Sequence, residues 1–396
     1  MKVLMINTVC GIGSTGRICV DLAQELEARG NEVKIAYGRN GDVPECCKEY
    51  AVRIGTDTGN KMHGVVSRLF DAQGLGSVSA TKKFLKWVDS YSPDLIWLHN
   101  LHGYYINYEL LFSWIKKHPS VKVKWTLHDC WGFTGHCTHF DFVGCDKWKG
   151  GCGQCPQKQE YPRSILWDRS RKNWERKRRA FTAVSHLEII TPSHWLAGIV
   201  KQSFLSRYPV HPIPNGIDIG IFHPTESDLR KTWGLEGKKI LLGVSSVWNQ
   251  RKGAEIFKQL ADMLDPSWKI VMIGVPRNRQ SEFPSQILMF DHLEEKDLLA
   301  KWYTAADVFL NPSYEETMGL TTVEALACGT PVILFDRTAV PELIDDTCGI
   351  VIREETAKAI MEALPQCSFP AEACINRASR YTREIFIKNC CDLIAE

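Results

Sequence analysis

Short apolar runs alternate with longer helical stretches along this chain of 396 residues, and the alternation restarts in the second half. Strands that alternate with helices are typical of βαβ units, which build parallel sheets. The length of the chain suits two domains. The runs interpreted as strands are Val3–Ile6, Val33–Tyr37, Leu95–Leu98 and Val123–Leu127, followed by Ile240–Val244, Ile270–Ile273, Val308–Leu310 and Val332–Phe335. We therefore predict an α/β fold of two doubly wound, Rossmann-like domains.

The proline-containing stretch Ser206–Phe222 is interpreted as the linker, which places the domains at about 1–205 and 206–380. The formal net charge is +2, so charge alone indicates no nucleic-acid partner. No apolar run reaches the length of about 18 residues that spans a bilayer. The run after Lys2 is short and is interpreted as a strand, not a signal peptide, so we expect a cytoplasmic protein.

The strongest motif is the segment Asn311–Val332, which predicts a strand, a loop and a helix that opens near Thr321. Free N–H groups at a helix start bind diphosphate well. Glu316 in the loop and Glu324 in the first helical turn lie eight residues apart, so both are able to face one ligand at the carboxyl end of the sheet. The alternative is that Glu324 only closes a capping box with Thr321.

This segment closely resembles the donor-site motif of family 4 glycosyltransferases with the GT-B fold, where two glutamates are separated by seven residues. The resemblance extends over nearly the whole chain. Its further matches are Thr191–Ser193, Pro214–Asp218 with Phe222, Ala325–Val332 and Pro341–Ile344. It implies two domains that face each other across a cleft, with the last helix, at 381–396, crossing back to the first domain.

The resemblance also assigns roles in the donor site. It implies that Glu316 contacts the hydroxyls of the donor sugar and that Glu324 hydrogen-bonds the ribose. The backbone expected to hold phosphate or sugar oxygens belongs to Met318, Gly319, Leu320 and Thr321.

One position departs from the family pattern. The family usually has an arginine five residues before a Lys-Gly pair, and these cations neutralise the leaving diphosphate. Here Lys252 is present, but Val247 occupies the arginine position. We expect Arg251 to replace it, since a guanidinium suits bidentate phosphate contacts. The alternative is that Arg251 is a solvated surface charge.

The first βα turn carries the glycines of a dinucleotide fingerprint, Gly11, Gly13 and Gly16. The acidic residue expected after the second strand is missing, and Arg39 stands nearby. The turn is expected either to approach the donor phosphates or the acceptor, or to be a tight turn that needs glycine geometry. His128 follows another strand and resembles the first-domain histidine near the donor sugar. His99 and His102 are weaker candidates.

The irregular segment 130–179 fits neither domain pattern and contains four clustered cysteines, here called the insert cysteines: Cys137, Cys145, Cys152 and Cys155. Cys152 and Cys155 have the spacing of a zinc knuckle, and the other two complete four thiolates. Because we expect this segment to lack a core of its own, a structural zinc ion would supply folding energy. Free or redox thiols and an iron–sulfur cluster are the alternatives.

The stretch Arg163–Arg179 has eight Lys or Arg residues, with Trp167 and Trp174 among them. A basic, aromatic helix predicts reversible binding to an anionic membrane surface, and an ordinary solvated helix is the alternative.

Together these features predict a retaining glycosyltransferase that uses a nucleotide-sugar donor and a saccharide acceptor. We expect the acceptor to be a lipid-linked polysaccharide intermediate and the enzyme to work at the inner face of a membrane. No cofactor is expected for catalysis. The alternatives are an NADP-dependent oxidoreductase that uses the glycine-rich turn, a zinc-containing nucleic-acid-binding protein, and a GT-B sugar-nucleotide epimerase.

Overall fold

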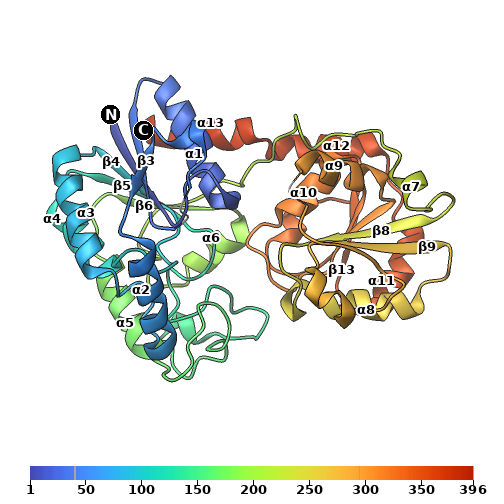
Figure 1. Cartoon of the computed structure of the whole chain (residues 1–396), viewed down its shortest axis with the longest axis horizontal. Coiled ribbons are helices and arrows are strands. Elements are labelled where there is room, and N and C mark those ends of the chain that lie inside the picture. The colour runs from blue at the N-terminus through green and yellow to red at the C-terminus, as the bar shows by residue number, and fades with distance from the viewer. Residues whose placement is uncertain (40–41, 294, 396) are drawn as a thin grey trace. The chain divides into compact units, whose positions relative to one another are not determined.

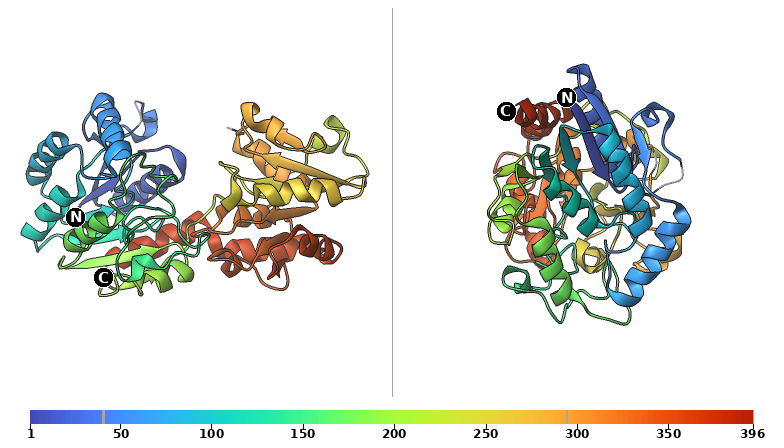
Figure 2. Two further views of the ribbon diagram at one scale, coloured as in Figure 1. Left: turned by 90° about the horizontal axis from the view of Figure 1, so that it is seen from below. Right: turned by 90° about the vertical axis from the view of Figure 1, so that its left-hand side faces the viewer.

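The computed structural model describes residues 1–39, 42–293 and 295–395. The chain divides into two compact units, one formed by Met1–Ile213 with Ile387–Glu396 and the other by Pro214–Phe386. Each unit has one sheet, of seven and six strands respectively, and the strand pairs of the described residues are parallel. Helices lie on both faces of each sheet (Figures 1 and 2). The prediction of two doubly wound domains is therefore confirmed.

The first unit has the strand order β3-β2-β1-β4-β5-β6-β7. Its strands are β1 (Lys2–Asn7), β2 (Glu32–Tyr37), β3 (Ala51–Arg53), β4 (Leu95–Leu98), β5 (Lys122–Thr126), β6 (Leu187–Thr191) and β7 (Val210–Pro212). Its helices are α1 (Gly13–Ala28), α2 (Asp57–Phe70), α3 (Val78–Tyr91), α4 (Tyr108–Lys117), α5 (Ser170–Phe181) and α6 (His194–Val200). The strand order reverses at β1, so the loops after β1 and β4 diverge and leave room for a ligand.

The second unit repeats this arrangement with the order β10-β9-β8-β11-β12-β13. Its strands are β8 (Lys239–Val244), β9 (Trp268–Ile273), β10 (Leu288–Phe290), β11 (Val308–Asn311), β12 (Val332–Phe335) and β13 (Gly349–Ile352). Its helices are α7 (Leu229–Thr232), α8 (Ala254–Met263), α9 (Lys296–Ala305), α10 (Leu320–Ala327), α11 (Ala357–Ala363) and α12 (Ala371–Ala378). Here the order reverses between β8 and β11.

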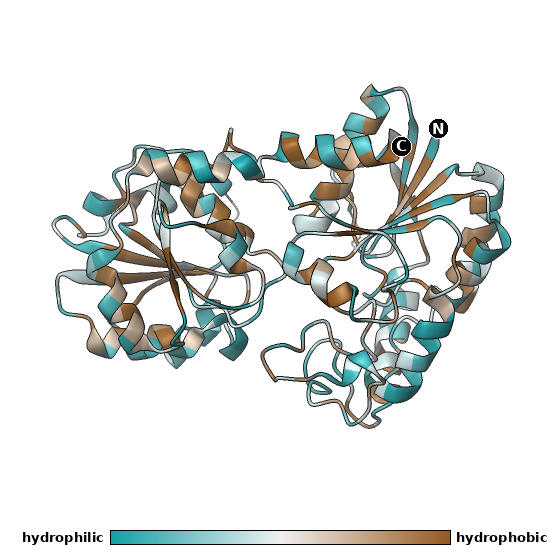
Figure 3. Ribbon diagram, turned by 180° about the vertical axis from the view of Figure 1, so that it is seen from behind, coloured by the Kyte–Doolittle hydropathy of each residue, from teal (hydrophilic) through white to brown (hydrophobic). Residues whose placement is uncertain are grey.

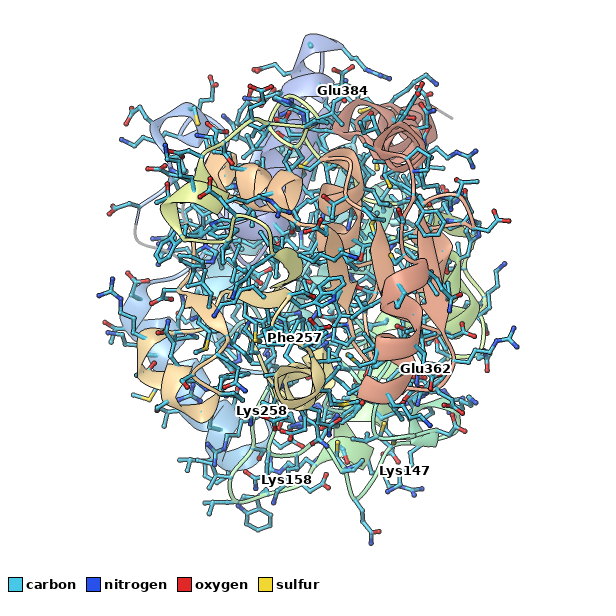
Figure 4. All side chains as sticks on the ribbon, turned by 90° about the vertical axis from the view of Figure 1, so that its right-hand side faces the viewer. Lys147, Lys158, Phe257, Lys258, Glu362 and Glu384 are labelled. Atoms are coloured by element: carbon cyan, nitrogen blue, oxygen red, sulfur yellow. The ribbon has the colours of Figure 1, made fainter. Side chains whose placement is uncertain are left out.

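Both sheets are covered on two faces, so their central strands are mostly apolar (Figure 3). All four residues of β4, β11 and β12 are buried. The covering helices are amphipathic, as α8 illustrates: Phe257 is fully buried, whereas the next residue, Lys258, lies on the outer side (Figure 4).

The segment between β5 and α5 has its own aromatic centre. The buried rings of Phe133, Phe140 and Trp148 contact one another with centroid separations of 4.9–6.3 Å. Trp148 also accepts a hydrogen bond on its carbonyl oxygen from the Trp174 indole of α5. The expectation that this segment lacks a core is therefore wrong.

The last helix, α13 (Arg383–Ala395), begins in the second unit and ends in the first. Near its end Asp392 forms an ion pair with Arg29, which follows α1. Among the described residues, no helix has the length and apolar character needed to cross a membrane.

Candidate active site

The switch point of the second sheet brings two loops together. One loop follows β8 and ends at Gly253, and the other follows β11 and ends at Gly319. At Gly253 the backbone φ is +72°, and a β-carbon there would lie 2.5 Å from the carbonyl oxygen of Pro312. Only glycine permits so close an approach of the two loops. Residues 64 positions apart in the sequence thus come into contact.

Lys252 and Glu316 form an ion pair across this switch point. Each side chain is only 17% exposed. Burial lowers the pKa of Lys252, while the Glu316 carboxylate opposes that shift and Arg251 reinforces it. The Ser313 hydroxyl donates a longer hydrogen bond of 3.4 Å to Glu316 Oε1. Lys252 and Glu316 therefore neutralise each other at the carboxyl ends of β8 and β11.

Arg251 lies beside this pair, but its guanidinium is already engaged. Its Nη1 donates a 2.8 Å hydrogen bond to the carbonyl oxygen of Glu315, and its own carbonyl accepts from the Tyr314 amide. Arg251 thus holds the β11 loop against the β8 loop. Val247, at the position where the family has arginine, is 53% exposed.

Helix α10 begins directly after the Glu316 loop. Gly319 precedes it with φ of +94°, and a β-carbon at this position would lie 2.8 Å from Val340 Cγ1. No side chain caps the helix start, so its backbone N–H groups remain available to a ligand. Met318 is buried beneath this turn, whereas Leu320 and Thr321 are half-buried.

The structure rejects the capping-box interpretation of Glu324, because the N-cap of α10 is Gly319 and not Thr321. Glu324 instead accepts a 2.9 Å hydrogen bond from the hydroxyl of Tyr303 in α9. Burial raises the pKa of Glu324, and the Tyr303 hydroxyl partly offsets this shift. Its carboxylate therefore has one fixed partner and is half-buried at the helix start.

Sequence reasoning missed the residues that orient this site. Thr338 follows β12, has φ of +49°, and accepts a 2.9 Å hydrogen bond from the Glu316 amide. Tyr303 holds Glu324 from the end of α9. The signal that points to Thr338 is its place after a strand of the same parallel sheet, since all such strand ends meet at one edge.

Several histidines lie at the carboxyl edge of the first sheet. His99 follows β4 and His128 follows β5, and their rings stack with Nδ1 of His99 3.0 Å from Nε2 of His128. Burial holds the pKa of His99 well below its usual range and lowers the pKa of His128 to about 4. Both rings are therefore neutral near pH 7, and one donates a hydrogen bond to the other.

A second pair lies next to the first. Nε2 of His102 is 2.8 Å from Oδ2 of Asp129, and its Nδ1 is 3.0 Å from the hydroxyl of Tyr161. Burial by itself would raise the pKa of Asp129, but His102 and the Trp131 amide outweigh burial and bring this pKa to about 2. The edge thus presents the Asp129 carboxylate hydrogen-bonded to the His102 ring.

The glycine-rich turn after β1 requires glycine at two positions. Gly11 and Gly13 have φ of +74° and +61°, and a β-carbon on Gly11 would meet the sulfur of Cys47 at 2.8 Å. Gly16 lies within the first turns of α1, and its carbonyl oxygen accepts from the Gly11 amide. The turn lies at the switch point of the first sheet.

The insert cysteines, to which the zinc prediction assigns the metal, lie near one another in the segment between β5 and α5. Among the described residues, no group of three or more His, Cys, Asp or Glu side chains is arranged to hold a metal ion. The insert cysteines pack instead against the aromatic core. Cys137 is buried and hydrogen-bonded to Cys155, and the Cys152 sulfur accepts a hydrogen bond from the Gly135 amide. The thiols therefore serve as packing groups around rings that fill the segment.

The basic stretch also differs from its interpretation. Trp174 is buried, and Lys177 is only 1% exposed. The Lys177 ammonium donates to the carbonyl oxygens of Trp131 and Thr134 at 2.7 and 3.0 Å. Arg176 makes a bidentate pair with Glu109 of α4. One face of α5 thus packs into the interior, and Arg171, Lys172, Arg178 and Arg179 are exposed on the rest of the helix.

Comparison with known proteins defines the class. Residues 15–220 match the family model Glycosyltransferase Family 4, and residues 238–368 match Glycosyl transferases group 1. The whole chain resembles solved GT-B structures. Sucrose-phosphate synthase from Thermosynechococcus elongatus superposes with a TM-score of 0.71 at 17% identity, covering 100% of this chain and 98% of that one. Anabaena HepE, solved in complex with UDP, gives a TM-score of 0.65 at 15% identity and full coverage of both chains. The fold and the matches define a GT-B glycosyltransferase.

The chain belongs to Glycosyltransferase Family 4. A relative in Escherichia coli K12, the proposed colanic acid biosynthesis glycosyl transferase WcaC, is 26% identical over 377 residues, which cover 91% of this chain and 90% of WcaC. Alpha-monoglucosyldiacylglycerol synthase of Streptococcus pneumoniae is 29% identical over 44% of each chain. The oxidoreductase and nucleic-acid hypotheses gain no support from these matches.

Proposed function

We propose that this glycosyltransferase moves a hexose from a nucleoside-diphosphate sugar to a saccharide hydroxyl and that the anomeric configuration is retained. The observation that carries the proposal is the Lys252–Glu316 pair beside the uncapped start of α10. A cation and backbone N–H groups suit a diphosphate, and a carboxylate suits sugar hydroxyls. HepE, a structural neighbour, is described in complex with UDP-glucose, which supports the donor class.

Each partner of the ion pair takes a ligand group when the donor binds. Lys252 turns to the diphosphate, and Glu316 accepts hydrogen bonds from hydroxyls of the sugar. Glu324 binds the ribose hydroxyls, and the amides of 318–321 hold phosphate oxygens. Lys252 and Glu316 neutralise each other when they are paired, so neither charge is left uncompensated in a half-buried place.

Transfer with retention follows a front-face course. The bond from the anomeric carbon to the diphosphate oxygen breaks, and its electron pair goes to the diphosphate. The acceptor oxygen bonds to the same face of the anomeric carbon, and its proton passes to the leaving diphosphate oxygen. Lys252 and the start of α10 stabilise the charge that develops there, with Arg251 adding a more distant positive charge.

The first unit is proposed to bind the acceptor at its carboxyl edge. His128 and the glycine-rich turn line this edge, and Asp129 offers a carboxylate that stays ionised. We propose a saccharide carried on a lipid, with the enzyme attached reversibly to an anionic membrane surface. The names of the relatives support this class, since two of them describe lipopolysaccharide core and glucosyldiacylglycerol synthesis.

A panel of nucleotide sugars tests the proposal. Wild-type protein is expected to be stabilised against heat by one donor type and to release its nucleoside diphosphate when an acceptor is present. Glu316→Gln should fold normally and lose turnover by about 10²-fold or more. An inverted product anomer, or full activity in this variant, would contradict the proposal.

A further inference from the structure

A continuous apolar patch lies on the surface of the first unit. Met62, Val65, Val66 and Phe70 repeat at helical spacing on the outer face of α2, and all four are exposed. Next to them lies the exposed segment 165–167. The apolar patch is therefore defined as Met62, Val65, Val66, Phe70, Ile165, Leu166 and Trp167.

Two contacts join the halves of this patch. The Ile165 amide donates a 2.7 Å hydrogen bond to the carbonyl oxygen of Arg68 in α2. The Arg169 guanidinium lies 5.9 Å from the Phe70 ring and 5.8 Å from the Trp167 ring. Met62 and Leu166 are 64% and 62% exposed, so the patch is no part of the core. An exposed apolar surface of this kind marks a binding site.

A basic pocket of about 510 Å³ opens on the same helix. Its cations are Arg39, Lys61 and Arg68, and Val65 belongs both to the pocket and to the apolar patch. Within the described residues these three cations form no ion pair with a carboxylate. Among the described residues that line the pocket, Asp57 is the acidic one, and it forms an ion pair with Arg53. The pocket thus carries an uncompensated positive charge suited to phosphate oxygens.

The basic pocket adjoins the edge proposed to bind the acceptor sugar. Tyr104 lines the pocket, and Arg68 hydrogen-bonds its hydroxyl. The Tyr104 ring contacts the edge of Tyr161, whose hydroxyl lies 3.0 Å from Nδ1 of His102. His102 in turn pairs with Asp129. A sugar at His102 and Asp129 and a phosphate in the pocket are therefore neighbouring groups.

We propose that the basic pocket binds the phosphate of an amphiphilic acceptor, a saccharide joined through phosphate to a long apolar chain, and that the apolar patch receives that chain. This inference rests on the proposed function and specifies its acceptor. The three features follow one another on the surface in the same order as the parts of the ligand. The edge at His102 and Asp129 faces the sugar, the basic pocket faces the phosphate, and the apolar patch faces the chain. The lipid-facing surface proposed here consists of α2 and segment 165–167, which is part of the predicted stretch Arg163–Arg179. These elements carry exposed large apolar side chains, and the described residues of α5 do not.

Calorimetric titration with farnesyl diphosphate tests the pocket, with inorganic diphosphate and farnesol as probes that lack one half of the ligand. Wild-type protein should bind farnesyl diphosphate at least about tenfold more tightly than either half, and Arg39→Gln/Arg68→Gln should weaken that binding about tenfold or more. The matched control Lys117→Gln/Lys201→Gln removes the same charge from exposed positions outside the pocket and should bind as wild type. Undiminished binding by Arg39→Gln/Arg68→Gln overturns the proposal.

The same titration separates the pocket from the donor site. Lys252→Met should keep farnesyl diphosphate binding but lose nucleoside diphosphate binding, so failure of one site is distinguished from failure of the other. If Lys252→Met abolishes farnesyl diphosphate binding, the diphosphate binds in the second unit and the pocket assignment is wrong.

Sedimentation with vesicles of phosphatidylcholine and phosphatidylglycerol distinguishes two binding modes, recognition of a lipid-linked acceptor and recognition of bilayer headgroups. Met62→Ser/Leu166→Ser should weaken both sedimentation and farnesyl diphosphate binding, whereas Met263→Ser/Val351→Ser, at exposed positions of the second unit, should weaken neither. A protein that sediments with these vesicles but does not bind farnesyl diphosphate recognises headgroups, which contradicts the acceptor assignment.

Discussion

Lys252→Met and Glu316→Gln should have opposite effects on the binding of a free nucleoside diphosphate. The two side chains neutralise each other, and each is 17% exposed. Lys252→Met removes a charge-assisted hydrogen bond to phosphate, which contributes about 1.5–3 kcal/mol. Affinity should therefore fall by about 10- to 100-fold. Glu316→Gln leaves the Lys252 charge uncompensated, so affinity for the diphosphate should stay the same or increase.

Turnover should behave differently from binding. Both variants are expected to lose about 10²- to 10³-fold in rate, since each removes a group that acts on the reacting bond or the sugar. Titration calorimetry with the nucleoside diphosphate of the preferred donor measures the affinities. Lys358→Met and Glu362→Gln are matched controls, because that pair in the same unit lies on the surface with side chains 81% and 67% exposed. If Lys252→Met binds diphosphate as wild type does, Lys252 is a structural partner of Glu316 and the donor-site argument is refuted.

Three further results are expected. Lys177→Met should lower the free energy of unfolding in urea by about 2–4 kcal/mol, because it leaves the buried carbonyls of Trp131 and Thr134 unpaired; a loss below about 0.5 kcal/mol would contradict this. Asp129 has a folded pKa of about 2 against an ordinary value of 3.8, so its stabilisation, about 2 kcal/mol, is complete above pH 4 and is lost as the pH falls towards 2. The difference in stability between wild type and Asp129→Asn should shrink over that range, and a difference independent of pH would count against the His102 contact. A zinc chelator should leave the melting temperature unchanged, since the aromatic core organises the insert cysteines; a fall of several degrees would show that a metal is needed.

Local patterns were enough to predict the sheets. Central strands such as β4 and β12 are apolar over their whole length, and this pattern needs no knowledge of distant contacts. Five strands were not among the predicted runs: β3, β6, β7, β10 and β13. Of these, β3, β7 and β10 have three residues each and no strong pattern. Their existence depends on pairing with a neighbour that has already formed.

The site was predictable in part for the same reason. Glu316 and Lys252 both follow predicted strands, and in a parallel sheet such positions share one edge. Their direct pairing was not predictable, because it depends on the close approach of two loops at Gly253 and Pro312. The face of α5 was misjudged because Lys177 packs onto an irregular segment whose fold has no sequence period.

The most direct measurement of the central claim is transfer of a labelled sugar from a nucleotide-sugar panel to a lipid extract, with the anomeric configuration of the product determined by NMR. The account predicts that wild-type protein incorporates one sugar with retained configuration and releases an equal amount of nucleoside diphosphate. Glu316→Gln and Lys252→Met should transfer the sugar and release nucleoside diphosphate far more slowly than wild type. Incorporation with inverted configuration, or equal transfer by these two variants, would contradict it.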